Sequence, residues 1–162
     1  MRTWIIACCI CIFCFFLPLQ CFIIGDNLGF GVQGAVFQYQ MTLQGNSLIP
    51  ITSQLRYVTS GIYSGKSALS VVIWTLGTVV LTATTILSLI HWNLLPHSRL
   101  KIIIAGLVSA SIFYLGSCAA TYGLFLSGPA GISLPIGVVI LIMFTIFLYS
   151  YQNLFFSNDG SP

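Results

Sequence analysis

The chain has 162 residues, of which 57% are hydrophobic and 4% are charged, whereas about 25% of the residues in an ordinary soluble domain carry a charge. Five basic and two acidic residues give a formal net charge of +3, and the basic residues form no patch. A soluble fold cannot bury so large an apolar fraction, and nucleic-acid binding needs clustered positive charge. We therefore expect an integral membrane protein that contacts lipid and has no nucleic-acid partner.

Four apolar stretches follow one another along the chain, each at least as long as the roughly 20 residues that a helix needs to cross a bilayer. They cover approximately residues 4–24, 67–95, 102–127 and 132–156. The sequence predicts one all-α membrane domain, a four-transmembrane-helix bundle whose first outer loop, residues 25–66, holds a small antiparallel β-hairpin or sheet.

The first apolar stretch also has the basic start of a secretory signal peptide. It is longer than a typical signal core, and no small-x-small cleavage motif precedes Gly25. We favour a retained span, with cleavage as the alternative.

Basic residues in short connections predict the orientation. Arg2 precedes the first stretch, and Arg99 and Lys101 lie between the second and third. By the positive-inside rule, both termini are cytoplasmic in a multi-pass protein of the cell membrane. Arg56 and Lys66, in the long loop, weigh in the opposite direction.

The long loop contains a strand pattern. Phe37, Tyr39, Met41 and Leu43 alternate with polar residues, which indicates a half-buried strand. Gly45-Asn46 suits a two-residue hairpin turn, and a second run, residues 47–59, is interrupted by Pro50. We expect a small sheet over the outer end of the helices, with its apolar face toward the membrane.

The same loop is the predicted partner-binding region. The alternative is a lid that covers the bundle and satisfies its own backbone. The candidate partner-binding residues are Phe37, Tyr39, Met41, Leu43, Arg56 and Tyr57.

Six cysteines and two histidines are the candidates for chemistry. Cys11 and Cys14 have the C-x-x-C spacing of redox motifs, but a thiol in apolar surroundings is inert unless a cation or a helix N-terminus activates it. His91 and His97 lack the further ligands that a metal needs. We expect no catalytic residue, cofactor or metal, and no enzymatic activity.

The third stretch carries a stripe of small residues, which in lipid lets helices approach closely. Its partner is another helix of the same chain or a second copy, forming a homo-oligomer. The predicted packing residues are Gly106, Ala110, Gly116, Ala120 and Gly123.

The second stretch carries Thr75, Thr78, Thr82 and Thr85 at helical spacing. These threonines either line a polar path or bond to their own backbone and to neighbouring helices. The predicted spans have no interior charge, which disfavours ion-coupled transport.

The order of four spans, a long first outer loop with strand character, a basic inner connection and a short second outer loop is similar to the claudin and peripheral-myelin-protein tetraspan group. The resemblance is topological. Residues 25–66 contain neither the Trp-based signature nor the two cysteines of that group, so no functional residue carries over.

Three hypotheses for function follow. The first is a non-enzymatic structural, adhesion or assembly subunit that acts through its outer loop on a protein partner. The second is a passive channel or carrier for a small solute, and the third is a thiol-dependent membrane oxidoreductase.

Overall fold

The structure is a computed structural model that describes residues 2–25, 28–90, 96–128 and 130–156. These residues form helices and strands in the order α1 (Arg2–Phe16), β1 (Gln20–Ile24), β2 (Gly29–Gln33), β3 (Phe37–Thr42), β4 (Gly45–Pro50), α2 (Ile51–Thr59), α3 (Gly65–Ile90), α4 (Pro96–Tyr122), β5 (Ser127–Gly128), β6 (Gly131–Leu134) and α5 (Ile136–Phe156).

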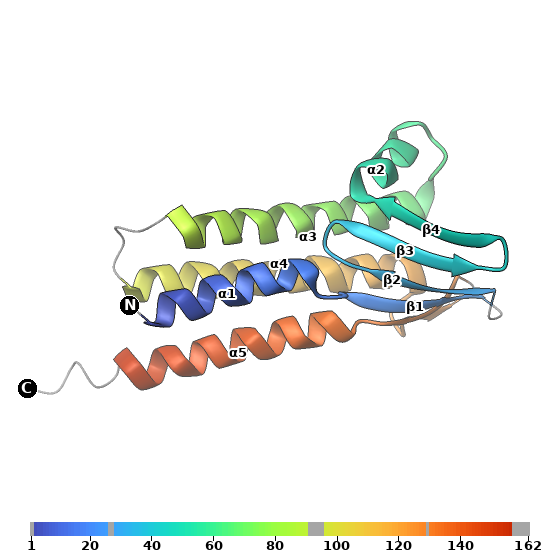
Figure 1. Cartoon of the computed structure of the whole chain (residues 1–162). Coiled ribbons are helices and arrows are strands. Elements are labelled where there is room, and N and C mark those ends of the chain that lie inside the picture. The colour runs from blue at the N-terminus through green and yellow to red at the C-terminus, as the bar shows by residue number, and fades with distance from the viewer. Residues whose placement is uncertain (1, 26–27, 91–95, 129, 157–162) are drawn as a thin grey trace, which may run out of the picture.

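The molecule has a helical half and a sheet half. Helices α1, α3, α4 and α5 lie alongside one another, and the sheet extends from one end of this group (Figure 1). Helix α4 contacts both α3 and α5, and α1 contacts α3. The first turn of α1 and the last turn of α5 lie at the end of the helices that is far from the sheet (Figure 1).

The sheet has six antiparallel strands in the order β4-β3-β2-β1-β6-β5. Strand β1 follows α1, and β6 precedes α5, so the sheet joins strands from the N-terminal and the C-terminal parts of the chain. The sequence predicted a small hairpin or sheet, and the observed sheet is larger than that.

The predicted four-transmembrane-helix bundle is wrong. Among the described residues, two helical segments, Gly65–Ile90 and Leu100–Tyr122, are long and apolar enough to cross a membrane. The apolar segments of α1 and α5, Ile5–Phe16 and Ile136–Ser150, are shorter. Residues 91–95 of the second predicted span lie outside the described residues.

The first and last predicted spans were too long because each merges a strand with a helix. Helix α1 ends at Phe16, just before Pro18, which lacks an N–H group and disfavours helical backbone in the preceding residue. The apolar residues after Pro18 then pair as β1 with β2 and β6. Similarly, β6 occupies residues 131–134, ahead of Pro135, and α5 begins only at Ile136.

The second predicted strand of the long loop is mostly helix. Strand β3 occupies the residues of the predicted first strand, but Thr42 pairs with Gly45, so Leu43 and Gln44 form the turn in place of Gly45-Asn46. Gly45 has a φ of +128°, a backbone conformation that favours glycine. Strand β4 ends at Pro50, where α2 begins.

The expected orientation of the sheet is also wrong. The glutamines of β3 face the helices, as shown by the hydrogen bond between Gln38 and Gln54 of α2. Tyr39 and Met41, one step along the strand, therefore face away from the helices. The inner side of the sheet carries the glutamines together with the buried Phe22, and its outer side is apolar.

The helical half has a continuous apolar core. Trp74 and Leu81 of α3 are buried against Leu107 of α4, Leu141 of α5 and residues of α1 such as Cys11. This core packs the four helices against one another beside the sheet.

Candidate functional site

Three glutamines stand side by side on the inner face of the sheet. Gln20 of β1 is opposite Gln33 of β2, and Gln33 is opposite Gln38 of β3. Because side chains alternate between faces along a strand, these cross-strand partners all lie on the side that faces the helices. A fourth glutamine, Gln54 of α2, is buried above them.

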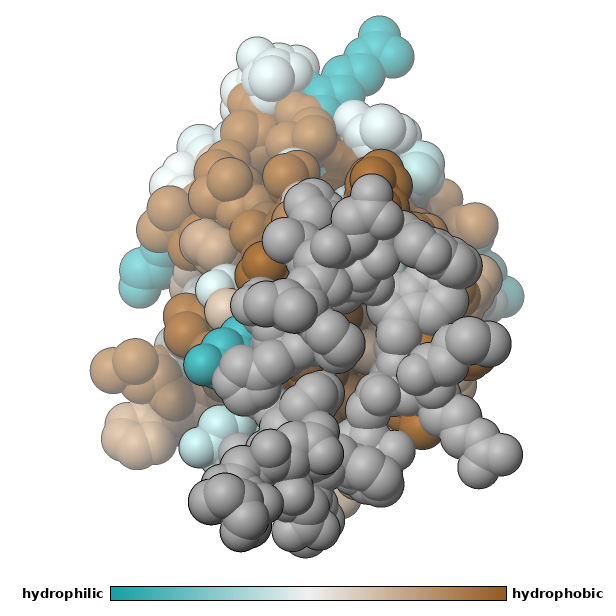
Figure 2. All heavy atoms as spheres, turned by 90° about the vertical axis from the view of Figure 1, so that its left-hand side faces the viewer, coloured by the Kyte–Doolittle hydropathy of each residue, from teal (hydrophilic) through white to brown (hydrophobic). Residues whose placement is uncertain are grey.

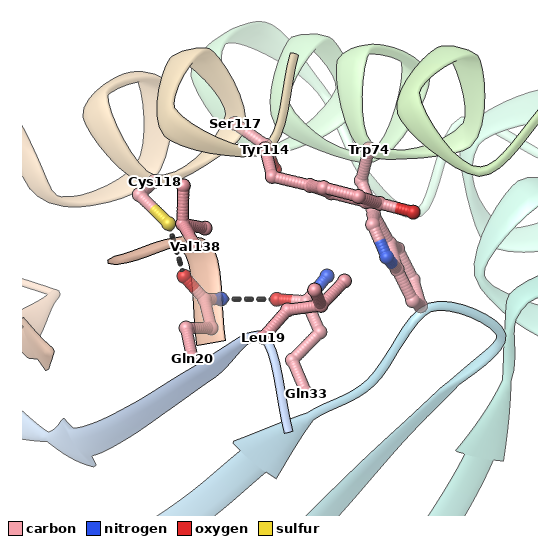
Figure 3. A pocket seen from close by; sticks show the side chains of 8 residues that line it. All are labelled: Leu19, Gln20, Gln33, Trp74, Tyr114, Ser117, Cys118 and Val138. Carbon is pink, nitrogen blue, oxygen red and sulfur yellow. Dashed lines mark hydrogen bonds between the residues drawn. The ribbon is translucent and has the colours of Figure 1, made fainter. Parts of the chain in front are cut away.

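Hydrogen bonds join these glutamines in pairs. Gln20 Nε2 donates to Gln33 Oε1, and Gln54 Nε2 donates to Gln38 Oε1 at 2.8 Å. Gln20 Oε1 also accepts from Ser133 Oγ of β6 at 3.1 Å. The first bond, and the contact between Gln20 and Cys118 of α4, are drawn in Figure 3.

The amide N–H groups of Gln33 take part in none of these bonds. Gln33 is only 8% exposed, and among the described residues its Nε2 group has no hydrogen-bond acceptor. A buried N–H group without a partner costs about 1–3 kcal/mol. Figure 3 shows this nitrogen on the side of the Gln33 side chain that faces Trp74 and Tyr114.

A cavity of about 200 Å³ lies beside the glutamines. The sheet, α2, α3, α4 and the α2–α3 connection all contribute to its wall. Its lining residues are Gln20, Gln33, Gln38, Gln54, Tyr63, Ser67, Ser70, Val71, Trp74, Thr121 and Tyr122. None of these residues carries a formal charge at neutral pH.

A second, smaller void of about 10 Å³ adjoins the same glutamines. It shares Gln20, Gln33 and Trp74 with the larger cavity, and it is drawn in Figure 3. About 10–15 Å³ on this scale is the space of one water molecule. The small void is therefore a pocket for a single solvent molecule, whereas the larger cavity has room for an organic ligand.

The helix side of the cavity is fixed by hydroxyl groups. Thr121 Oγ1 lies 2.6 Å from Ser70 Oγ, which in turn lies 2.9 Å from Ser117 Oγ. The indole N–H of Trp74 donates to the carbonyl of Gly34 at 3.1 Å, which fixes the orientation of the ring. These bonds tie α3 to α4 and to the sheet at the level of the cavity.

Tyr63 contributes a hydroxyl group from the α2–α3 connection. Burial, together with the neighbouring Tyr57, raises the pKa of Tyr63 above its ordinary value of 10.0. Its ring makes an edge contact with Tyr57, with ring centroids 5.5 Å apart. The Tyr63 hydroxyl is therefore protonated at neutral pH, and it can both donate and accept hydrogen bonds.

The outer face of the sheet is apolar. Cross-strand pairing places Ile132, Ile23, Phe30 and Met41 in one row across four strands, and all four side chains are exposed. We call this row and the parallel row beside it the outer sheet face. The parallel row consists of Leu134, Cys21, Val32, Tyr39 and Leu48.

The structure separates the predicted partner-binding residues. Tyr39 and Met41 lie on the outer sheet face, with Phe37 on the same side of β3. Leu43 is in the β3–β4 turn and is 88% exposed. Arg56 and Tyr57 belong to α2, on the opposite side of the sheet.

The threonines of α3 use their hydroxyl groups mainly within the helix. The hydroxyls of Thr75, Thr78, Thr82 and Thr85 all donate to backbone carbonyls four residues earlier. Thr78 also donates to the carbonyl of Ala35 at 2.6 Å. These bonds are those expected of threonines that pack in a helix bundle, and a pore-lining role for them stays a prediction.

The small residues of α4 have different surroundings. The backbone of Gly106 lies against the side chain of Thr84 on α3, whereas Gly116 faces Ile73 with space to spare. Ala110 is fully buried in the core, and Ala120 is partly buried. Gly123 follows the end of α4 with a φ of +87°, in the conformation that glycine provides after helix C-termini.

The cysteines are all free thiols. Cys11 and Cys14 are completely buried in the helix core, while Cys118 contacts Gln20. Within the described ranges, no three His, Cys, Asp or Glu residues are grouped so that they could hold a metal ion. His91 lies outside the described residues.

The glutamines were missed by sequence reasoning. Gln38 was recognised only as one of the polar residues of an alternating strand. Gln20 lay inside the predicted span 4–24. A signal was present, because glutamine recurs in segments that have no charged residue. The pattern alone does not say which face is inward.

Comparisons of the chain with protein-family models, with curated proteins and with solved structures found no match.

Proposed function

We propose that this chain is a non-enzymatic membrane protein that assembles with a second copy of itself through the outer sheet face. In this proposal the helical half is embedded in lipid, and the sheet lies outside the lipid layer. The observation that carries the proposal is an uncharged, exposed apolar sheet face at one end of an apolar helical half.

The exposed surface of α3 and α4 supports the lipid location. The core helix of a soluble protein is mostly buried, but only 44% and 39% of the most apolar windows of these two helices are buried. The 26 residues of α3 give a length of about 39 Å at 1.5 Å per residue, more than a hydrocarbon core of ~30 Å. Exposed apolar residues of α3 include Leu69, Val72, Leu76, Val79, Ile86, Leu87, Leu89 and Ile90.

Helices α1 and α5 continue this apolar surface. Phe13 and Phe16 of α1 are exposed, as are Val139, Met143 and Ile146 of α5. Seen from the end far from the sheet, the visible flanks are mostly brown, with few teal residues (Figure 2). Lipid removes the cost of exposing such a surface to water.

The charge distribution supports an orientation. Arg2 of α1 and Arg99 and Lys101 of α4 belong to helix ends far from the sheet, whereas Arg56 of α2 and Lys66 of α3 belong to the sheet end. By the positive-inside rule, the excess of basic residues at the far end favours a cytoplasmic location for that end, and in this proposal the sheet lies on the outer side.

The composition of the sheet supports self-association. Residues 27–55, which include β2, β3 and β4, contain no charged residue. An apolar face without charge is complementary to a second copy of itself, as a two-fold symmetric interface requires.

The position of the cysteines supports a non-enzymatic role. Cys11 and Cys14, the pair with redox spacing, are both 0% exposed. A substrate would have to enter the packed helix core to reach them.

The oligomeric mass in lipid nanodiscs, measured by native mass spectrometry, tests the assembly. The wild-type chain should be a dimer, and Met41→Glu should be a monomer because a buried, unpaired carboxylate at the interface is strongly unfavourable. Phe30→Glu, at the paired position on β2, should have the same effect. Both side chains are about half exposed in the single chain, at 46% and 44%, so the substitutions do not disturb its core.

Thr52→Glu is the matched control, because Thr52 is exposed on α2 and lies away from the outer sheet face. This variant should remain a dimer. A monomeric wild-type chain, or dimers that persist in both Met41→Glu and Phe30→Glu, would contradict the proposal.

A further inference from the structure

We propose that the cavity between the glutamines and the helices binds an uncharged, hydroxyl-rich ring of about the size of one monosaccharide. The cavity lies on the inner side of the sheet, so this binding is independent of assembly through the outer sheet face.

The size of the cavity fits one small ring. Its volume is about 200 Å³, and a cavity of about 150 Å³ in another protein holds one benzene molecule. A single water molecule needs only about 10–15 Å³ on the same scale. The space is thus larger than solvent requires and too small for a nucleotide or a disaccharide to enter completely.

The lining excludes charged ligands. Amide, hydroxyl, phenol and indole groups make up its polar surface, and no lining residue is ionised at neutral pH. An ion placed among them would lose its hydration without gaining a counter-charge, which is strongly unfavourable.

The polar side chains of the wall disfavour a purely apolar ligand. Gln38 and Gln54 line the cavity together with the hydroxyl-bearing Ser67, Thr121 and Tyr63. A polar group that a ligand buries without giving it a hydrogen bond is destabilising. Hydroxyl groups of a ligand can both donate to and accept from these side chains.

Aromatic rings complete a surface suited to a sugar. Trp74 and Tyr122 line the cavity beside the glutamines, and the Trp74 ring is fixed by its hydrogen bond to Gly34. A pyranose ring presents C–H groups on its faces and hydroxyls at its rim. Aromatic side chains and amides in one wall offer partners for both kinds of group.

The mouth of the cavity lies where the helices meet the sheet. Ser67, in the first turn of α3, is exposed, and Tyr63 and Thr121 are partly exposed. The ring can therefore come from a free sugar in water or from the headgroup of a glycolipid whose chains lie in the bilayer. The recognised chemistry is the same for both sources.

Trp74 is a built-in reporter for the test. In a parent protein with Trp4→Phe and Trp92→Phe, the fluorescence comes from Trp74 alone, since the chain has three tryptophans. The parent, in phosphatidylcholine nanodiscs free of sugar detergents, is titrated with methyl β-glucoside, methyl β-galactoside and myo-inositol. In a second arm, the nanodiscs contain glucosylceramide at increasing fractions.

We expect a saturable change in Trp74 fluorescence in at least one arm. Gln33→Leu, which replaces a polar side chain of the cavity wall by an apolar one, should weaken binding at least tenfold. Ser67→Phe, which fills the mouth from an exposed position, should do the same without touching the buried network. Ser64→Phe is the matched control, because Ser64 is exposed three residues earlier and does not line the cavity.

The outcomes separate the sources and can overturn the proposal. A response to the soluble rings identifies a free sugar, and a response to glucosylceramide alone identifies a lipid headgroup; both support the site. No saturable response in either arm from a folded parent would overturn it. A response that Ser67→Phe leaves unchanged would also overturn it, because binding would then lie elsewhere.

Discussion

Gly106 and Gly116 of α4 differ in what surrounds them, although both lie in the same helix and face α3. A methyl group on Gly106 would overlap the side chain of Thr84, whereas one on Gly116 would have Ile73 at an ordinary contact distance of 3.5 Å. Thr84 is β-branched, and its hydroxyl is bonded to the carbonyl of Val80, so it has little freedom to move aside.

This contrast predicts opposite effects of the same substitution. Gly106→Ala should lower the free energy of unfolding by about 1–3 kcal/mol, through overpacking at the α3–α4 contact. Gly116→Ala should be neutral or raise it by up to about 1 kcal/mol, because alanine is the better helix former. Denaturant titration of both variants in the same micelles is the measurement. Equal effects would show that α3 and α4 do not pack as described.

At the residue scale, the sequence shows which side chains share a face but not which face is inward. The alternation from Phe37 to Thr42 correctly separates apolar from polar residues, whereas Leu43 and Gln44 lie in the turn. The usual expectation buries the apolar set, yet here Gln38 is turned to the helices and Met41 outward. Gln20 and Gln33 make the inner face polar, and they come from strands that local periodicity did not reveal.

At the scale of elements, the junction between α1 and β1 determines how α5 begins. The carbonyl of Leu19 accepts hydrogen bonds from the N–H groups of Gly137 at 3.0 Å and Val138 at 3.3 Å. The first N–H groups of a helix have no partner within the helix, so Leu19 caps α5 from a distant part of the chain. This close approach leaves no room for a side chain at Gly137.

Gly137→Ala should therefore uncouple α5 from β1. The added Cβ would lie 2.6 Å from the Cα atom of Leu19, and backbone atoms cannot swing aside as a flexible side chain can. We expect a loss of about 1–3 kcal/mol in the free energy of unfolding. Val139→Ala, at an exposed position two residues later, should change it by less than about 0.5 kcal/mol. Denaturant titration of the two variants would refute the capping role if Gly137→Ala were as stable as Val139→Ala.

The same junction explains why the elements were misread from sequence. Residues 20–24 and 131–134 extend apolar runs that continue into α1 and α5, and a short apolar run is as compatible with a strand as with a helix. Pro18 and Pro135 mark the boundaries, but both lie inside the predicted spans 4–24 and 132–156. Only the long-range pairing of β1 with β6 distinguishes the two cases.

At the scale of the whole molecule, composition predicts an apolar protein, and the structure shows where the apolar surface is. Helices α3 and α4 were predicted in their approximate places, because each is long and apolar throughout. The size of the sheet was not predictable, since β1–β4 and β5–β6 come from two parts of the chain that are far apart in the sequence. The cavity could not be predicted either, as its wall combines residues of β1, β2 and β3 with residues of three helices.

The division into a lipid-embedded helical half and an exposed sheet can be measured with spin labels. Labels are placed singly at Val79 of α3, which is 58% exposed, and at Leu43 of the β3–β4 turn, after replacement of the six native cysteines. Electron paramagnetic resonance in nanodiscs then compares collisions with oxygen, which concentrates in lipid, and with a water-soluble nickel chelate. We predict that oxygen relaxes the label more strongly at Val79, and the nickel chelate more strongly at Leu43. Stronger relaxation by nickel at Val79 would contradict the lipid location of the helical half.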